Sequence, residues 1–515
     1  MTTTSLKSAS TLPIQAIRRK ALNQMGERLV LDQTAIPTEN ATTTGGTSRF
    51  ESRARPQRNS ASMPNAFAYI ALILWPVVTL AFFASMRPTQ ALIWSLLGGF
   101  LLLPVNTAFD LPGVPALDKT SIPSISALIV ALLFVNGPVV RPPREWWVIT
   151  LLVAYIVSPV FTVLTNRDAL QFGSVLLPGL RAYDAFSAAA YRAIDLIPFL
   201  LGFNILKGPR AQDYLMRALV MAALGYSLLI LVEIRLSPQL HTWLYGFFPS
   251  AFDQQIRGAG FRPVVFLGHG LMVALFISLA LVAAVHLARQ RVQLYGISAW
   301  FWVAYLLGIL ILCRSLGPLM LSFAAVGVLF LVRRRGVQLV CALAAVTLLA
   351  YPMLRGADIV PVHALADKIG EVNEERAASF RTRIDNEDSL LARANQRPLF
   401  GWGGYARNRV YDENTGRDLS ITDGTWIIMI GNYGWIGYIS AFGLLCLPMV
   451  AAWRRGRRLT EASAALSLIL TVNMVDLLPN SSLSSMTWVI AGSLMSRAAR
   501  SNPSEATSRI PRNSA

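Results

Sequence analysis

The strongest constraint on how this chain folds is a succession of apolar blocks, each about 17 to 25 residues long and almost free of charge. A helix of about 20 residues crosses the roughly 30 Å hydrocarbon core of a bilayer, so each block has the length of a transmembrane span. Only 14% of the residues are charged, whereas soluble domains carry roughly a quarter. The sequence lacks the alternating apolar segments of a membrane β-barrel. We therefore predict an all-α polytopic membrane protein.

The blocks predict about 12–13 transmembrane helices and one large extracytoplasmic loop. The expected spans begin near residues 66, 90, 121, 146, 188, 213, 264, 294, 315, 337, 425, 462 and 484. The expected organisation is a disordered basic cytoplasmic tail (1–64), transmembrane helices 1–10 (65–354), a large periplasmic loop (355–424), C-terminal transmembrane helices (425–497) and a polar tail (498–515).

The net charge of +18 is concentrated in the N-terminal tail and in short loops between the blocks. These loops carry Arg141 and Arg144, Lys207 and Arg210, Arg289 and Arg291, Arg333 to Arg335, and Arg454 to Arg458. This is the positive-inside pattern of membrane proteins, and no nucleic-acid recognition motif accompanies it, so we expect no nucleic-acid partner. The pattern places 355–424 outside the cytoplasm. Thirteen spans would separate the two basic tails, so we expect one segment, 90–105 or 188–206, not to cross.

Ionisable residues are sparse inside the expected spans, where Asp195, Glu233 and Asp476 are the main acids. Solute carriers usually have such residues at mid-span, so their scarcity favours chemistry at the outer face over transport. The three cysteines lie in apolar spans without a CxxC pattern, and the four histidines lack metal-ligand spacing. We therefore expect neither a metal site nor a cofactor.

Arginines and one aspartate lie where the large loop and an earlier loop meet the spans. Arg257 and Arg262 precede the span near 264, Arg393 and Arg397 lie in the large loop, and Asp423 precedes the span near 425. Guanidinium groups bind phosphate oxygens in pairs, and a carboxylate beside them can act as a general base. The alternative is that these arginines are solvated charges paired with acids of the same loop.

Several short motifs in 190–445 resemble the O-antigen ligase and Wzy polymerase superfamily of bacterial surface-polysaccharide assembly. The matching pieces are Arg257-x-x-Gly260-Phe261 before a span, Cys313-Arg314-Ser315, the loop sequence Arg-Pro-Leu-Phe-Gly-Trp-Gly (397–403), and a Gly-x-x-Gly helix beginning at Gly431. The segment 177–185 also resembles members encoded with exopolysaccharide clusters.

The resemblance implies a metal-independent, inverting glycosyl transfer at the periplasmic face of the bacterial inner membrane. Its donor would be an oligosaccharide on undecaprenyl pyrophosphate, and its acceptor a sugar hydroxyl. The arginines that would hold the pyrophosphate are Arg257, Arg262, Arg393 and Arg397. Where the ligases have a histidine, this sequence has Asp423, which becomes the candidate catalytic base; it could equally cap the following helix.

Three further residues are candidates for contact with sugar: Trp402, Tyr405 and His269. Trp402 and Tyr405 could instead anchor the membrane interface, and His269 could pack inside the helix bundle. The function expected from these features is a Wzy-type polymerase that builds exopolysaccharide, capsule or O-antigen, with membrane lipids and a chain-length regulator as partners. The alternatives are an O-antigen ligase acting on lipid A core and, from another class, a transporter or flippase for lipid-linked sugars.

Overall fold

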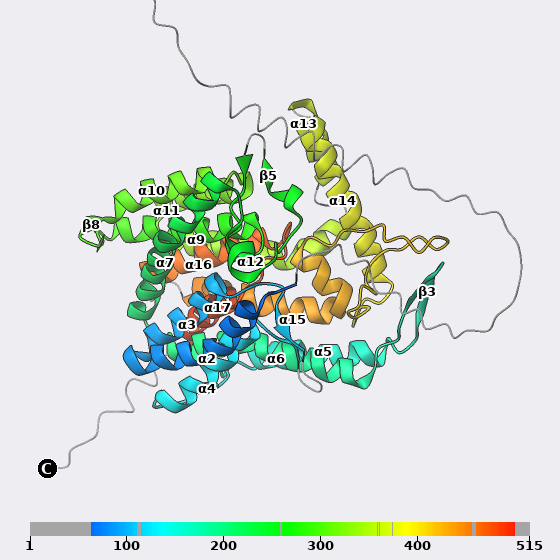
Figure 1. The fold of residues 1–515 in the computed structure, drawn as a ribbon, viewed down its shortest axis with the longest axis horizontal. Helices are drawn as coiled ribbons and strands as arrows, with labels where there is room; N and C mark the ends of the chain where they lie inside the picture. Colours follow the sequence, from blue (N-terminus) through cyan, green and yellow to red (C-terminus); the bar gives the residue numbers. More distant parts are fainter. Residues whose placement is uncertain are drawn as a thin grey trace, which may run out of the picture. The chain divides into compact units, whose positions relative to one another are not determined.

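A computed structural model describes residues 63–110, 115–257, 260–357, 359, 361–372, 374–455 and 460–499. The predicted all-α polytopic fold is confirmed (Figure 1). The helices are α2 (Ala66–Ser85), α3 (Pro88–Leu102), α4 (Ser121–Phe134), α5 (Trp146–Leu164), α6 (Ala182–Ile205), α7 (Pro209–Leu236), α8 (Leu240–Tyr245), η1 (Phe252–Gln255), α9 (Gly270–Arg289), α10 (Ala299–Leu312), α11 (Leu316–Leu331), α12 (Arg334–Gly356), α13 (Val362–Val372), α14 (Glu374–Asn395), α15 (Thr425–Arg455), α16 (Glu461–Asp476) and α17 (Ser485–Ala499).

Strands in the described residues form only short antiparallel hairpins in the loops. They are β1 (Ala108–Phe109) with β2 (Leu117–Asp118), β3 (Leu170–Phe172) with β4 (Val175–Leu177), β5 (Ile256–Arg257) with β6 (Gly260–Phe261), and β7 (Gln293–Leu294) with β8 (Ile297–Ser298).

Each of the thirteen expected spans coincides with a helix. In the part of the chain that the structure describes, seven helices are long and apolar enough to cross a bilayer: α2, α5, α6, α7, α9, α12 and α15. α6, which contains one of the two segments proposed not to cross the membrane (188–206), is among them. α3, the other one, has 15 residues, or about 22 Å of rise, and is shorter than the hydrocarbon core. The helices α4, α10, α11, α16 and α17 have similar lengths, 14 to 16 residues.

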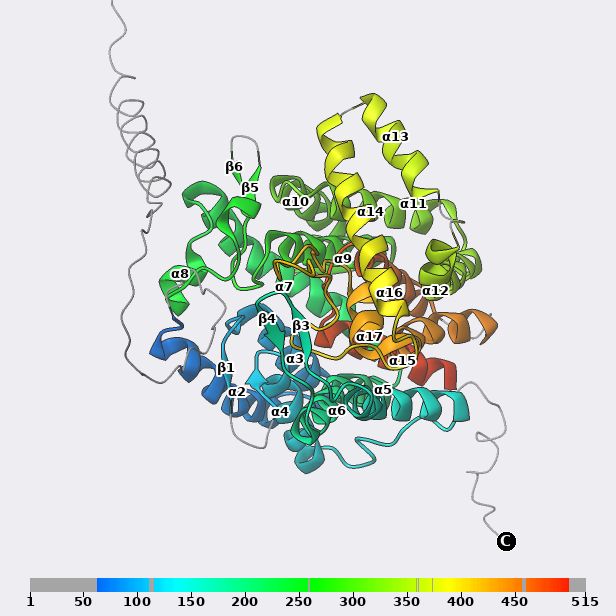
Figure 2. The ribbon, with the colours of Figure 1, turned by 90° about the vertical axis from the view of Figure 1, so that its right-hand side faces the viewer.

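Two closely packed groups of spans can be distinguished within the described chain (Figures 1 and 2), while α2, α3 and α4 pack on one another and α12 packs on α15. α9 contacts α7, α10, α11 and α16. In its apolar 18-residue stretch, 89% of the residues are buried, the largest share among the seven long spans. The second group consists of α5, α6, α15 and α17. Polar side chains cap the starts of two helices: Asn65 Oδ1 accepts from the backbone N–H of Ala68, and Thr460 Oγ1 accepts from that of Ser463.

Loop contacts define two ends of the helix bundle. At the end that we call the loop end, Asn166, which follows α5, donates from Nδ2 to Gly401 O at 2.9 Å. At the other end, called the basic end, Glu145 before α5 and Arg454 at the end of α15 line one cavity of about 510 Å³. Ala498, at the end of α17, lines the same cavity. The chain therefore leaves its last described helix at the basic end.

The chain enters the bundle at the loop end. Asn65 donates from its backbone N–H to Tyr245 O and from Nδ2 to Leu244 O, each at 2.9 Å, which fixes the start of α2 beside the loop 237–269. α3 ends there too, since Tyr245 Oη donates to Leu102 O at 2.5 Å. The first described residues, 63–65, therefore lie at the loop end, and the cytoplasmic location of the tail 1–64 stays a prediction. The predicted tails themselves, 1–64 and 498–515, lie almost wholly outside the described residues.

α15 is broken at Gly434, where φ is 66° and ψ is −168°. The turn 398–403 of the large loop fills the break. Four backbone hydrogen bonds join the two segments: Trp402 N to Gly431 O (2.8 Å), Gly403 N to Asn432 O (2.9 Å), Trp435 N to Pro398 O (2.7 Å) and Ile436 N to Leu399 O (3.3 Å). Glycine is needed at Gly434 because its φ is positive and an added Cβ would lie 2.5 Å from Phe400 N.

Candidate functional site

A cavity of about 410 Å³ at the loop end, here called the arginine cavity, brings together four of the predicted site residues. Arg257, Arg262, His269 and Asp423 all line it, although they come from two loops more than 150 residues apart. It also contains Arg383 of α14, Asp476 of α16 and the polar side chains of the α16–α17 loop (Asn480, Ser481 and Ser482). The arrangement combines three guanidinium groups with two carboxylates.

The two arginines before α9 are positioned by the β5–β6 hairpin. The backbone N–H of Arg262 donates to Gln255 O at 2.8 Å, and its Nε donates to Arg314 O at 3.4 Å. The Arg314 side chain in turn donates from Nη1 to Arg257 O at 2.7 Å. The Cys-Arg-Ser segment after α10 therefore supports the hairpin that carries Arg257 and Arg262.

Arg262 is the buried cation of this cavity, with only 9% of its surface exposed. Burial, together with the positive charges of Arg257 and Arg383, lowers the pKa of Arg262 to about 10. Arg262 still carries its charge at neutral pH. No carboxylate of the described residues lies within ion-pair distance of it. A buried guanidinium without a carboxylate partner is suited to bind an anion from outside.

His269 caps α9 and faces the same cavity. Its Nδ1 accepts from the backbone N–H of Leu271 at 3.1 Å, which assigns the neutral tautomer with its proton on Nε2. Burial lowers the pKa of His269, and Arg262 and Arg257 lower it further, while Asp423 opposes them. His269 therefore offers a neutral Nε2–H donor. The prediction of a helix-packing role and that of a cavity role are both consistent with this position.

Asp423 is held at the rim of the cavity from two sides. Asn386 Oδ1 accepts from the backbone N–H of Ile421 at 3.0 Å, and the backbone N–H of Thr425 donates to Leu477 O at 3.0 Å. The Asp423 carboxylate is 46% exposed and lies 4.0 Å from Arg383 Nε. Within the described chain, no backbone N–H of the first turn of α15 bonds this carboxylate. The helix-capping interpretation is therefore not supported.

The sequence analysis did not identify Arg383 or the polar residues Asn480 to Ser482, here called the polar floor, as part of the site. Asp476 accepts from Asn480 Nδ2 at 3.0 Å and from Ser482 Oγ at 2.7 Å, so a fixed carboxylate lies beneath the arginines. The polar run Asn480 to Ser482 between two apolar spans was a signal for this floor. Nothing in its sequence context distinguishes Arg383 from the other arginines of the loop.

Arg393 and Arg397 do not line the arginine cavity, contrary to the expectation that all four arginines hold one pyrophosphate. Their guanidinium carbons lie 3.5 and 4.4 Å from the ring centroid of Trp402. Arg397 Nη1 also donates to Asn166 Oδ1 at 2.8 Å and to Thr165 O. These contacts fix the turn 398–403 against the end of α5. We therefore reassign both arginines to holding that turn.

Trp402 belongs to the same structural cluster. It is only 6% exposed, and its Nε1 donates to Arg393 O at 2.7 Å. A ring buried beneath two guanidinium groups has no free face for a sugar. Tyr405 lies elsewhere: it lines a second cavity of about 340 Å³ at the loop end, here called the tyrosine cavity, together with Asp184, Tyr191 and Tyr433.

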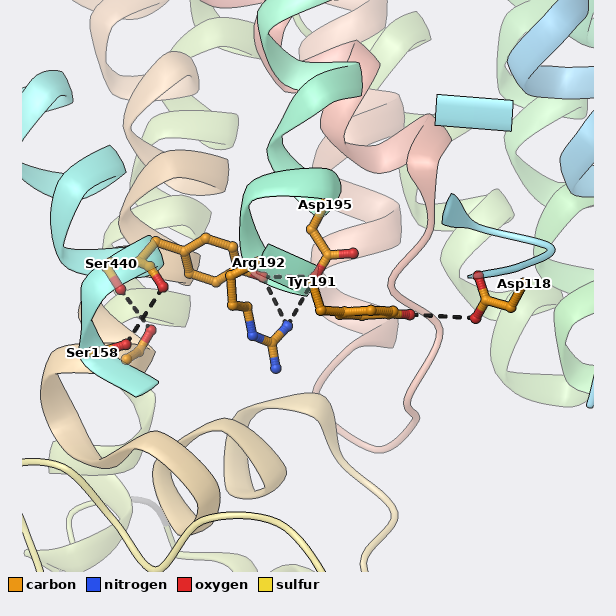
Figure 3. Close-up of polar contacts among 8 residues, drawn as sticks. Asp118, Ser158, Tyr191, Arg192, Asp195 and Ser440 are labelled. Atoms are coloured by element: carbon orange, nitrogen blue, oxygen red, sulfur yellow. Dashed lines mark hydrogen bonds and ion pairs between the residues drawn. The ribbon is translucent and has the colours of Figure 1, made fainter. Parts of the chain in front are cut away.

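The acids predicted inside the spans are satisfied within the fold. Figure 3 shows Arg192 pointing toward Asp195, with Nη1 to Oδ2 at 2.9 Å. Tyr155 Oη, 2.9 Å from Arg192 Nη1, donates to Asp195 at 3.2 Å. Glu233 Oε2 accepts from the backbone N–H groups of Val264 and Val265 at 2.6 and 2.8 Å, so Glu233 shapes the loop that leads into α9.

No protein-family model matches this chain, and no curated protein matches it significantly.

Proposed function

We propose that this multi-pass membrane protein is a Wzy-type polymerase of the bacterial inner membrane. It joins repeat units carried on undecaprenyl pyrophosphate into a longer surface polysaccharide, and the loop end faces the periplasm. The observation that carries the proposal is the arginine cavity, in which Arg257, Arg262 and Arg383 lie together with Asp423. A diphosphate needs positive charge, and a hydroxyl nucleophile needs a base, so this combination suits glycosyl transfer from a diphosphate.

In this proposal the guanidinium groups of Arg257 and Arg262 bind the diphosphate oxygens of the donor. The Asp423 carboxylate takes the proton of the acceptor hydroxyl, whose oxygen attacks the anomeric carbon of the donor from the face opposite the diphosphate. The bond from the anomeric carbon to the diphosphate oxygen breaks, and the lipid diphosphate leaves with the electron pair. The arginines, together with the Nε2–H of His269, stabilise the charge that develops on the leaving group.

The test is a deletion of the gene in the source strain, complemented with wild type, Asp423→Asn or Arg262→Ala. Asp385→Asn and Arg417→Ala are matched controls, because both residues are exposed in the same loop and neither lines the cavity. We expect single repeat units to accumulate on the lipid carrier and long polymer to disappear with the two cavity variants, at normal protein levels.

Two other results would assign other functions. Long polymer that persists on the lipid carrier but never reaches lipid A would identify a ligase. Lipid-linked units trapped at the cytoplasmic face would identify a flippase, and the arginine cavity would then not be a catalytic site.

A further inference from the structure

The residues that line the tyrosine cavity differ in chemistry from those of the arginine cavity. α5 and α6 form one side, and the turn that follows Gly403 and the break in α15 form the other. Its lining includes the rings of Tyr191, Tyr405 and Tyr433 and the carboxylate of Asp184. None of its described lining residues is a lysine or an arginine. The cavity is therefore unsuited to a diphosphate.

A partly buried polar network fixes two of the three rings. Tyr191 points toward Asp118 (Figure 3), with Oη to Oδ2 at 3.5 Å, and Asp118 itself is held by the backbone N–H groups of Thr120 and Ser121 at 2.8 Å each. The Arg192 guanidinium lies 4.5 Å from the ring centroid of Tyr433 while it pairs with Asp195. The rings are thus oriented before any ligand arrives.

Tyr405 is presented by a strained backbone. Its φ is +57° and that of Ala406 is +60°, two consecutive non-glycine residues in the left-handed region. The next residue, Arg407, keeps the backbone in this conformation, because its side chain is fully buried and donates to Pro178 O at 2.8 Å and Asp168 O at 3.0 Å. Tyr405 remains 62% exposed, and its hydroxyl donates to Asp184 Oδ1 at 2.8 Å. Strain of this kind persists where the surrounding structure over-determines it, and it is concentrated at ligand sites.

We propose that the tyrosine cavity binds an uncharged sugar unit. A sugar ring has apolar C–H faces that pack on tyrosine rings, and hydroxyl groups that donate to a carboxylate such as Asp184. Pockets with apolar walls and a few convergent polar groups bind small ligands of this type. In the polymerase proposed above, on which this assignment rests, the bound unit belongs to the glycan chain rather than to the lipid diphosphate.

The experiment measures binding of a soluble oligosaccharide to the full-length protein in lipid nanodiscs by calorimetry. The probe is the oligosaccharide released by mild acid from the lipid-linked pool of the deletion strain, so it carries neither lipid nor diphosphate. Tyr405→Ala removes the ring, and Tyr405→Phe keeps the ring without its hydroxyl. Ala188→Phe fills the cavity from α6 without removing a hydrogen bond, so it tests the proposal independently of the strained turn.

We expect Tyr405→Ala to weaken binding roughly tenfold, which corresponds to about 1.4 kcal/mol, because an aromatic contact is lost. Ala188→Phe should weaken binding by a similar factor because its ring occupies the cavity. Tyr405→Phe should stay within about twofold of wild type, and so should Arg262→Ala. The proposal is overturned if the wild type does not bind the probe, if both cavity variants bind it normally, or if Arg262→Ala weakens it as much as Tyr405→Ala.

The two proposals fail separately. Polymer synthesis that survives Arg262→Ala and Asp423→Asn would remove the polymerase, yet a Tyr405-dependent affinity for the oligosaccharide would still identify a sugar site. Normal affinity in Tyr405→Ala and Ala188→Phe would remove the sugar site, and the polymerase would stand.

Discussion

The two cavities of the loop end have similar volumes but opposite chemistry. The arginine cavity presents three guanidinium groups, one of them deeply buried, around two carboxylates. The tyrosine cavity presents aromatic rings and a carboxylate, and Arg192, which stacks on Tyr433, is already paired with Asp195. A lipid-linked glycan has the same division, since its diphosphate is anionic and its sugars are largely neutral. In the proposed polymerase, the two cavities at this end of the bundle would recognise the two halves of such a substrate separately.

The polymerase proposal requires the loop end, with both cavities, to face the periplasm. The largest expected effect is therefore an all-or-none difference in cysteine labelling between the two ends of the bundle. The native cysteines are buried. We expect Met63→Cys, at the loop end and 76% exposed, to react with an impermeant maleimide added to intact spheroplasts. Arg454→Cys, at the basic end, should react only after lysis. The reverse pattern would place both cavities in the cytoplasm and contradict periplasmic polymerisation.

Asp423→Asn should have the next largest effect. Loss of a positioned general base lowers rates by about 10²–10⁴-fold, so initial rates of polymer formation by purified protein should fall within that range. Asp385→Asn serves as the control. If Asp184→Asn, in the tyrosine cavity, reduced the rate more than Asp423→Asn, the assignment of chemistry to the arginine cavity would be wrong.

Arg262→Ala should lower the rate by about 10²–10³-fold, because a preorganised donor to the leaving group is lost. Inorganic pyrophosphate should inhibit the wild type and inhibit Arg262→Ala much less. Tyr405→Ala should retain the pyrophosphate inhibition of the wild type. Equal loss of inhibition in both variants would mean that the two cavities do not separate charge from sugar.

Gly434→Ala should damage the tyrosine cavity more than the arginine cavity. A Cβ at this position meets Phe400 N at 2.5 Å and the residue must keep a positive φ, which costs roughly 1–3 kcal/mol. We expect a lower Tm and weaker oligosaccharide binding, with pyrophosphate inhibition largely kept. Gly443→Ala, on the same helix, is the comparison variant, because a Cβ there meets only leucine methyl groups, at 3.1 Å or more. An equal loss of both ligands in Gly434→Ala would argue for general unfolding.

The smallest expected effect is a pH dependence from His269. Because burial and the nearby arginines lower its pKa, the unfolded chain binds the proton more tightly than the folded protein. The stabilising contribution of the neutral ring is therefore present above about pH 6.5 and is lost as the pH falls through the lower folded pKa. The Tm of wild type should decrease below pH 6.5 more than that of His269→Asn, which can still cap α9. Parallel curves for both proteins would exclude this contribution.

Apolar block length predicted the helices well, because a span must satisfy its own backbone over a fixed thickness. Four of the eight predicted site residues do line the arginine cavity: Arg257, Arg262, His269 and Asp423. They could be predicted because each lies where a loop of one face meets a helix. The rest depended on packing. Arg383 and Arg393 lie on the same helix, about 15 Å apart along its axis, so only one of them can reach the cavity. The sequence contains no sign of which one it is.

The break in α15 has a consequence for how the protein opens. The amides of Trp435 and Ile436 bond to the turn 398–403, and those of Trp402 and Gly403 bond to the helix. None of the four amides can exchange its hydrogen with solvent unless the turn separates from the helix. In hydrogen exchange, these residues, some thirty apart in the chain, should behave as one cooperative unit, and their shared opening free energy would measure how firmly the loop that carries Tyr405 is tied to the membrane domain.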